Sequence, residues 1–200
     1  MANTLFTVQE LPGKGRGLVA SRDLPANTVV LTEKPWLVGG TPWELTLGFA
    51  LQAQCAKPHM PETMLLKRYA RSGAGLTQWN AEDEKSMAVV REQGALSDIQ
   101  SVYDVMCTNN IFCGNGQKGL FCFAAMFNHS CFPTCAPTLL DTSTGQTEYR
   151  TLRDVKAGEE LTILYAAFDV DGGTPEEKKA VMDVEMKKEY GFVCDCNPYK

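Results

Sequence analysis

Short apolar runs bounded by turn-forming residues occur in two separate parts of the chain, before residue 40 and after residue 107. Runs of this length, rich in β-branched and aromatic residues, are typical of β-strands. Pro35 interrupts the longest run and places it at a sheet edge or a bend, because proline has no N–H to donate. The predicted strands cover residues 5–8, 29–38, 138–140, 147–152 and 161–165.

The pattern changes to a helical period between these two parts. Apolar residues recur three positions apart at Ile99, Val102 and Val105, after Ser97 as a plausible N-cap. Residues 41–106 are therefore predicted to form a helical insertion between two β-rich portions.

A further helix is predicted near the end of the sequence. Thr174 is a suitable N-cap, Pro175 fits the first turn, and the helix is expected to run to about Tyr190. The fold class is thus mainly β with a helical insertion (α+β). The predicted segments are residues 1–40, 41–106, 107–170 and 171–200.

Composition narrows the classes of protein that fit. The 200 residues are 44% hydrophobic and 22% charged, which suits one globular domain with a sizeable core. A net charge of −5 argues against general affinity for nucleic acid or anionic membranes. Neither a secretory signal nor a membrane-length apolar run is visible, so an intracellular protein of the nucleus or cytoplasm is expected. The eight cysteines are then interpreted as thiols or metal ligands before disulfides.

The segment 127–135 concentrates side chains that can do chemistry. It places the amide of Asn128, the imidazole of His129 and the thiol of Cys131 beside Pro133. The uncharged run 119–127 before it predicts a buried strand or helix that holds these groups in place. An apolar core segment that ends in a polar turn is the simpler alternative.

Three further segments suggest binding or turns. The loop that contains Gly13, Gly15 and Gly17 can bring bare backbone groups close to a ligand, although this segment alone favours a hairpin turn. Asn115-Gly116 predicts a second hairpin. Cys194-x-Cys196 is typical of two thiolates on one metal, with zinc as the default.

Four motifs occur in one order along the chain, namely Gly15-Arg16-Gly17, Asn128-His129-Ser130-Cys131-x-Pro133, Gly158-Glu159-Glu160-Leu161 leading to Tyr165, and Cys194-x-Cys196. This ordered set resembles SET-domain protein lysine methyltransferases. The helical insertion and the helix before Tyr190-x-Phe192-x-Cys194 look most like the SET and MYND subgroup or its fungal-type relatives, although the ligands of a MYND finger are missing. The resemblance implies a SET fold of small β-sheets in which a C-terminal segment forms a pseudoknot.

The resemblance also implies S-adenosylmethionine as cofactor and a protein lysine as substrate, with histones as candidates. Methyl transfer would then depend on alignment and desolvation, with Tyr165 as the catalytic residue. Phe112, Tyr165 and Tyr190 are expected to line the channel for the substrate lysine. A catalytically inactive interaction module derived from the SET fold is the alternative. The expected cofactor-binding residues are Lys14, Gly15, Arg16, Gly17, Leu18, Asn110, Asn128, His129 and Phe192.

The predicted zinc site departs from the family pattern. The resemblance implies that Cys131, Cys194 and Cys196 bind the metal, but Tyr199 stands where a fourth cysteine belongs. Three thiolates are too few for a closed structural zinc site. Cys135 or a cysteine beyond residue 200 could supply the fourth ligand, or the site is empty. Thr134 also replaces the asparagine usual in the family.

Overall fold

The computed structural model describes residues 5–41, 44, 45, 48, 103, 106, 107, 109–165 and 174–196. It separates into two compact units. The first consists of Met1–Glu33, Met126–Asp141 and Gln146–Lys200, and the second of Lys34–Ala125 and Thr142–Gly145. The predicted helical insertion lies almost entirely outside the described residues.

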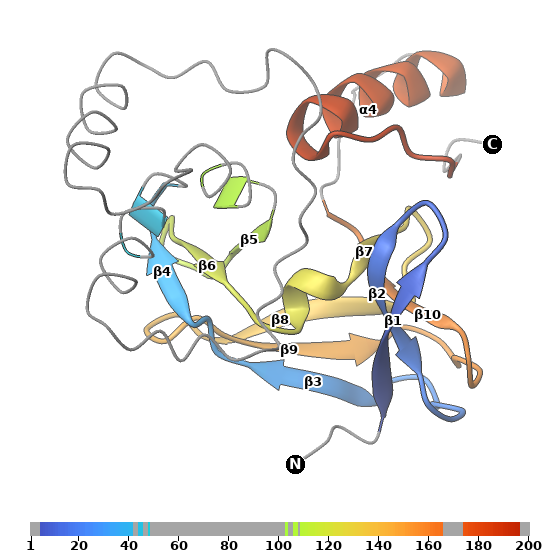
Figure 1. Cartoon of the computed structure of the whole chain (residues 1–200), viewed down its shortest axis with the longest axis horizontal. Helices are drawn as coiled ribbons and strands as arrows, with labels where there is room; N and C mark the ends of the chain where they lie inside the picture. The colour runs from blue at the N-terminus through green and yellow to red at the C-terminus, as the bar shows by residue number, and fades with distance from the viewer. Residues whose placement is uncertain are drawn as a thin grey trace. The chain divides into compact units, whose positions relative to one another are not determined.

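A four-stranded sheet of the first unit contains Asn128 and His129 of the segment 127–135 (Figure 1). Its order is β1 (Phe6–Leu11), β2 (Gly15–Ala20), β10 (Glu160–Ile163) and β7 (Asn128–His129). β1 and β2 form an antiparallel hairpin, which confirms the turn reading of the glycine loop. β10 runs antiparallel to β2 but parallel to β7, so Asn128 lies opposite Thr162. The sheet thus joins segments that are far apart in the sequence.

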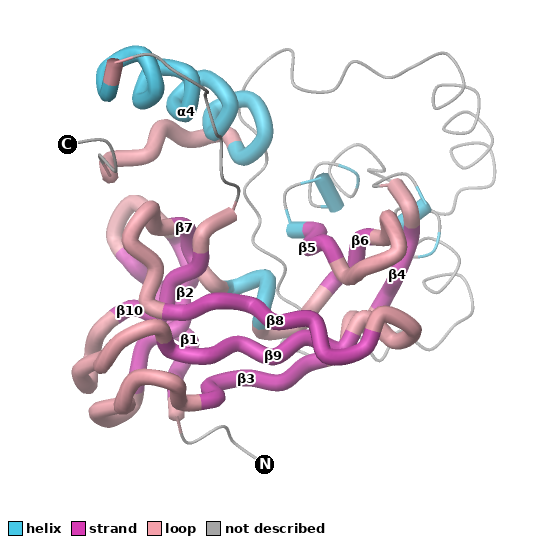
Figure 2. The backbone as a smooth tube through the Cα atoms, turned by 180° about the vertical axis from the view of Figure 1, so that it is seen from behind, coloured by secondary structure: helices cyan, strands magenta, loops and turns pink. Residues whose placement is uncertain are grey.

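A three-stranded antiparallel sheet completes the first unit, with the order β3 (Val29–Glu33), β9 (Gln146–Thr151) and β8 (Cys135–Asp141) (Figure 2). Alternate residues of β9, namely Thr147, Tyr149 and Thr151, are buried, as expected when one face of a strand packs on the core. The ring of Tyr149 stacks on Phe127 with 4.8 Å between centroids. This contact ties the sheet to the residue that precedes β7.

The second unit contains a sheet of three short antiparallel strands. Its order is β4 (Leu37–Gly39), β6 (Lys118–Leu120) and β5 (Asn110–Phe112). The hairpin between β5 and β6 turns at Asn115 and Gly116, whose φ angles of 51° and 71° lie in the left-handed region that these residue types tolerate. The hairpin prediction is therefore confirmed.

Two sequence runs are divided in the structure. The run 29–38 gives β3 and β4 as separate strands on either side of Pro35, in agreement with the predicted bend. The uncharged run 119–127 is predicted as a strand or a helix. It contains the end of β6 followed by a single 3-10 turn, η1 (Ala124–Met126). Phe121, Ala124 and Phe127 are buried, so the run has the core position predicted for it.

The helix α4 (Pro175–Tyr190) has well-defined ends. Thr174 caps its N-terminus in a capping box with Glu177, and Gly191 ends it with φ 79°. Both the helix and its N-cap confirm the prediction. The helix buries Met182 and Met186 against Cys194, which holds the following tail segment close to it.

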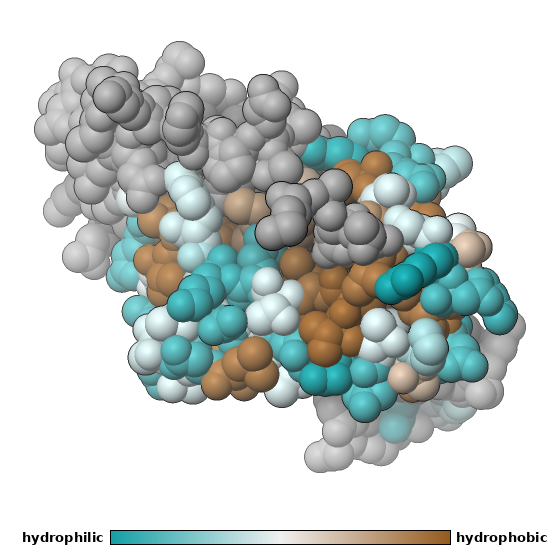
Figure 3. Space-filling model, turned by 90° about the horizontal axis from the view of Figure 1, so that it is seen from below, coloured by the Kyte–Doolittle hydropathy of each residue, from teal (hydrophilic) through white to brown (hydrophobic). Residues whose placement is uncertain are grey.

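Hydrophilic residues and clusters of hydrophobic residues both appear on the face of the molecule seen in Figure 3. Large apolar side chains are exposed in both units, among them Phe132 at 63% and Phe112 at 65%. No described helix has both the length and the apolar composition needed to cross a membrane.

Candidate cofactor and metal site

Asn128 is fixed by groups from two other strands. Its Nδ2 donates hydrogen bonds to Glu160 Oε1 at 2.7 Å and to the carbonyl oxygen of Arg16 at 3.3 Å. The second carboxylate oxygen of Glu160 accepts a bond from Lys14 Nζ at 2.8 Å. This hydrogen bond raises the pKa of Lys14. Two predicted cofactor residues, Lys14 and Asn128, therefore share one carboxylate, and a third, Arg16, bonds to Asn128 through its carbonyl oxygen.

Glu160 was given no role by the sequence, although it stands in one of the four motifs. In the structure its carboxylate bridges Lys14 and Asn128 across the sheet. The sequence signal that could have identified it is an acidic residue at the start of a predicted strand beside an apolar run, since such a group needs partners wherever folding removes it from water. Glu160 is thus a further residue of the candidate site.

Gly17 is required by this arrangement for a steric reason. A Cβ atom at this position would lie 2.5 Å from Leu11 Cδ1 and 2.7 Å from Asn128 Nδ2. Glycine therefore allows Asn128 to reach the backbone of β2. This contact is made within the protein, and the predicted role of Gly17 toward a cofactor stays a prediction.

His129 is buried next to the aromatic residues of the site. Burial lowers the pKa of its imidazole to about 4, so the ring is neutral near pH 7. The N–H of Tyr165 donates to its Nδ1 at 3.3 Å. Its centroid lies 5.5 Å from that of Tyr165 and 6.1 Å from that of Phe192.

Tyr165 follows β10 and is held through its hydroxyl group. The hydroxyl donates a hydrogen bond to the carbonyl oxygen of Phe127 at 2.7 Å. Burial raises the pKa of this phenol, so the hydroxyl keeps its proton at neutral pH. Its ring lies 4.8 Å from that of Tyr190 and 6.5 Å from that of Phe192, measured between centroids.

The structure therefore brings together Tyr165 and Tyr190, two of the three residues predicted to line the channel. The third, Phe112, lies on β5 of the second unit, as does Asn110. The amide of Asn110 donates to the carbonyl oxygens of Met106 at 2.7 Å and Cys107 at 2.9 Å. The roles predicted for Asn110 and Phe112 stay predictions.

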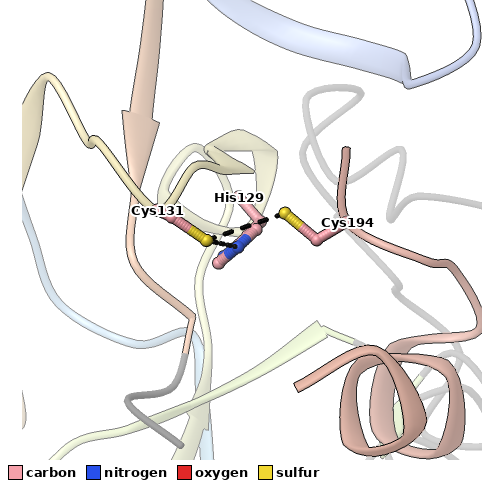
Figure 4. A group of neighbouring side chains, drawn as sticks. All are labelled: His129, Cys131 and Cys194. Atoms are coloured by element: carbon pink, nitrogen blue, oxygen red, sulfur yellow. Dashed lines mark hydrogen bonds between the residues drawn. The ribbon is translucent and has the colours of Figure 1, made fainter. Parts of the chain in front are cut away.

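The three predicted metal ligands also lie close together in the first unit. The sulfur of Cys131 is 3.7 Å from that of Cys194 and 3.4 Å from His129 Nε2, and Figure 4 shows these side chains pointing toward one another. The N–H of Cys196 donates to the sulfur of Cys194 at 3.3 Å. Cys135 stands apart from this group. It is fully buried and accepts a hydrogen bond from Thr134 Oγ1.

The thiols of this group differ in acidity because their surroundings differ. Burial, together with the neighbouring thiol of Cys194, raises the pKa of Cys131. Burial also acts to raise the pKa of Cys196, but the N–H of Cys131 and neighbouring side chains hydrogen-bond to its sulfur and lower the pKa overall. Two or more thiols and an imidazole nitrogen at these distances form a donor set that suits zinc.

The tail that carries Cys194 is fastened to α4 by polar and apolar contacts. Lys179 Nζ donates to the carbonyl oxygen of Cys194 at 2.9 Å and also pairs with Asp183. Met182 contributes a thioether sulfur 3.6 Å from the sulfur of Cys131. α4 therefore positions Phe192 and both tail cysteines relative to β7.

Comparisons with known proteins agree on one family. A family model described as the SET domain matches residues 15–166. The "Histone-lysine N-methyltransferase SMYD3" of Mus musculus is 32% identical, over 46% of this chain and 20% of that protein. The "Histone-lysine N-methyltransferase SET5" of Meyerozyma guilliermondii is 28% identical, over 61% and 24%. The chain thus covers only 20% to 24% of these relatives.

Two further similarities extend over most of the chain. The "Putative SET domain-containing protein L678" of Acanthamoeba polyphaga mimivirus is 24% identical, over 92% of this chain and 72% of that protein. The crystal structure of the SET domain of LSMT, bound to lysine and AdoHcy, has a TM-score of 0.55 at 15% identity. That match covers 97% of this chain and 54% of the other.

Proposed function

The chain belongs to the SET-domain family and has its fold of small β-sheets, and we propose that it is an S-adenosylmethionine-dependent protein lysine N-methyltransferase. The observation that carries the proposal is the position of Tyr165. Its hydroxyl is fixed beside β7, next to His129 and within one unit with the Lys14, Glu160 and Asn128 group. The names of the curated relatives, which are histone-lysine methyltransferases, support the same reaction.

The groups around Glu160 fit the charges of the cofactor. S-adenosylmethionine carries an ammonium group, a carboxylate, a sulfonium ion and an adenine ring. The site offers the carboxylate of Glu160, the cation of Lys14 and the amide of Asn128 for the polar part. Phe192, 38% exposed beside His129, offers a ring face for the adenine. The bound cofactor would supply an activated methyl group on sulfur.

Tyr165 acts by orientation in this proposal. Its proton is donated to the carbonyl oxygen of Phe127, so we propose that the hydroxyl oxygen interacts with a substrate amine as a hydrogen-bond acceptor. The raised pKa of the phenol makes it a poor base at neutral pH. Its contribution is therefore to align the amine for attack in line with the methyl group.

The aromatic rings of Tyr165 and Tyr190 supply the second contribution. Their centroids are 4.8 Å apart, so they form an apolar wall that excludes water. A lysine amine placed against such a wall loses hydration, which lowers its pKa and favours the neutral nucleophile. The substrate is proposed to be a protein lysine, and a basic tail such as that of a histone suits the net charge of −5.

The direct test is methyl transfer from labelled S-adenosylmethionine by the purified chain. Histones and a whole-cell lysate serve as substrates, and mass spectrometry locates the label. We expect label on a protein lysine. Failure of S-adenosylmethionine to bind in calorimetry would refute the proposal, whereas binding without turnover on any substrate would favour the alternative of an inactive interaction module.

A further inference from the structure

The metal group of the first unit has three predicted thiolate ligands, Cys131, Cys194 and Cys196. A closed structural zinc site needs a fourth ligand. Cys135 is unsuitable, because its sulfur lies in the core beside Thr134 and outside the group of donor atoms. The described residues instead place a ring nitrogen of His129 within 4.8 Å of the sulfurs of both Cys131 and Cys194.

The distances within this group can be compared with a tetrahedral zinc site. Zn–S bonds of about 2.3 Å at tetrahedral angles separate two sulfurs by about 3.8 Å. A Zn–N bond of about 2.0 Å separates nitrogen and sulfur by about 3.5 Å in the same geometry. The observed values are 3.7 Å between the sulfurs of Cys131 and Cys194, and 3.4 Å from Cys131 Sγ to His129 Nε2. We infer that His129 Nε2 is the fourth ligand of a Cys₃His zinc site with Cys131, Cys194 and Cys196.

Asp195 is the competing oxygen ligand. Its carboxylate lies within 4.8 Å of the sulfurs of Cys194 and Cys196, but Asp195 is exposed. His129 is buried and faces both Cys131 and Cys194 (Figure 4). Binding zinc removes less water from a buried imidazole than from an exposed carboxylate, so the desolvation cost is lower for His129. Three sulfur ligands and one nitrogen ligand are also a common set for structural zinc.

Metal binding assigns the ring proton of His129 to a particular nitrogen. A neutral imidazole that binds zinc through Nε2 must carry its proton on Nδ1. In the structure the N–H of Tyr165 donates to Nδ1 at 3.3 Å, which corresponds to the other tautomer, with Nε2–H directed at the sulfur of Cys131. Loading with zinc would therefore move the ring proton and end this one long hydrogen bond, while the three thiols release their protons to solvent.

The decisive measurement uses the whole chain without any substitution. Mass spectrometry measures the zinc content. The absorption spectrum of the cobalt(II) form gives the number of thiolate ligands, and ¹⁵N NMR of the zinc form gives the tautomer of His129. We expect one metal per chain, three thiolates and a His129 ring bound through Nε2. Four thiolates, three thiolates with an unbound His129 ring, or no metal would each overturn the inference.

Matched variants give an independent test in a zinc competition assay. His129→Ala should weaken zinc binding by about 100-fold or more, since loss of supporting outer groups alone can reach that range. His129→Cys should restore binding with a four-thiolate cobalt spectrum. Asp195→Asn and Cys135→Ala should bind zinc within about a factor of three of the unmodified chain.

Two results from the variants would overturn the inference. One is zinc binding by His129→Ala that is as tight as in the unmodified chain. The other is loss of zinc in Asp195→Asn while circular dichroism shows a folded protein. If His129→Ala fails to fold, the NMR and cobalt measurements on the unmodified chain decide the question. These experiments measure metal binding and not turnover, so their outcome tests the zinc site independently of the proposed methyl transfer.

Discussion

Replacement of Tyr165 by phenylalanine separates the catalytic use of its hydroxyl from the structural use of its ring. The substitution removes only the oxygen that donates to the carbonyl of Phe127 at 2.7 Å. The ring keeps its contacts with Tyr190 and His129, at centroid distances of 4.8 Å and 5.5 Å. The aromatic wall should therefore survive while the group that aligns the amine is lost.

The two consequences of Tyr165→Phe differ in size. One neutral hydrogen bond contributes about 1 kcal/mol to folding, so the free energy of unfolding should fall by that amount. Loss of a single preorganised polar group at a reacting centre costs about 10²- to 10³-fold in kcat. That corresponds to about 3 to 4 kcal/mol of activation free energy. The effect on turnover should thus exceed the effect on stability severalfold.

Tyr149→Phe is the matched control for this experiment. Within the part of the chain that the structure describes, the hydroxyl of Tyr149 is buried without a hydrogen-bond partner. Burial of such a group is unfavourable by about 1 to 3 kcal/mol, so its removal should leave stability unchanged or raise it. The phenylalanine ring can still stack on Phe127, and turnover should be unaffected.

The assay combines urea unfolding, calorimetry with S-adenosylmethionine, and turnover at saturating cofactor. Tyr165→Phe should bind the cofactor normally and turn over at least about 100-fold more slowly. Equal turnover in the Tyr165 and Tyr149 variants would refute the reasoning. So would a loss of activity in Tyr165→Phe that merely follows a loss of folded protein.

Three further predictions follow from other contacts. Glu160→Gln replaces a carboxylate that accepts from Asn128 and should weaken S-adenosylmethionine binding about tenfold in calorimetry; an unchanged affinity would contradict the role given to Glu160. Thr174→Ala should lower the free energy of unfolding by about 1 kcal/mol in urea, while Thr174→Ser should restore most of it, because the capping box needs a hydroxyl. The hydrogen bond from Arg153, followed by the N–H of Lys156, lowers the pKa of Glu159 from 4.5. Protonation at acid pH therefore removes stability as the pH falls below about 4.5, and Glu159→Gln should show a smaller loss across that range.

Local features of the sequence predicted much of the secondary structure. The Asn115-Gly116 turn and the Thr174-Pro175 helix start were both predicted correctly, because each depends on the conformational preferences of neighbouring residues. The bend at Pro35 follows from the missing N–H in the same way. The order of the strands could not be obtained from such local rules.

Long-range contacts account for what the sequence alone missed. The bonds from Lys14 and Asn128 to Glu160 join three separate strands or turns, and nothing in their spacing specifies that meeting. For His129 a signal was present. In an extended chain residues two apart point to the same side, and the spacing of His129 and Cys131 agrees with the shared ligand proposed for them. The family resemblance implies instead that His129 holds the cofactor, and that role stays a prediction.

The close approach at Gly17 has a consequence for how this sequence can change. An added methyl group there would meet both Leu11 Cδ1 and Asn128 Nδ2. Shortening Leu11 would relieve the first clash, but the second could be relieved only by moving the amide that bonds to Glu160. We therefore expect deep mutational scanning to show position 17 as intolerant even in a Leu11→Ala background. A second substitution cannot compensate for a side chain at position 17, because it would have to displace Asn128, which is itself a proposed cofactor-binding residue.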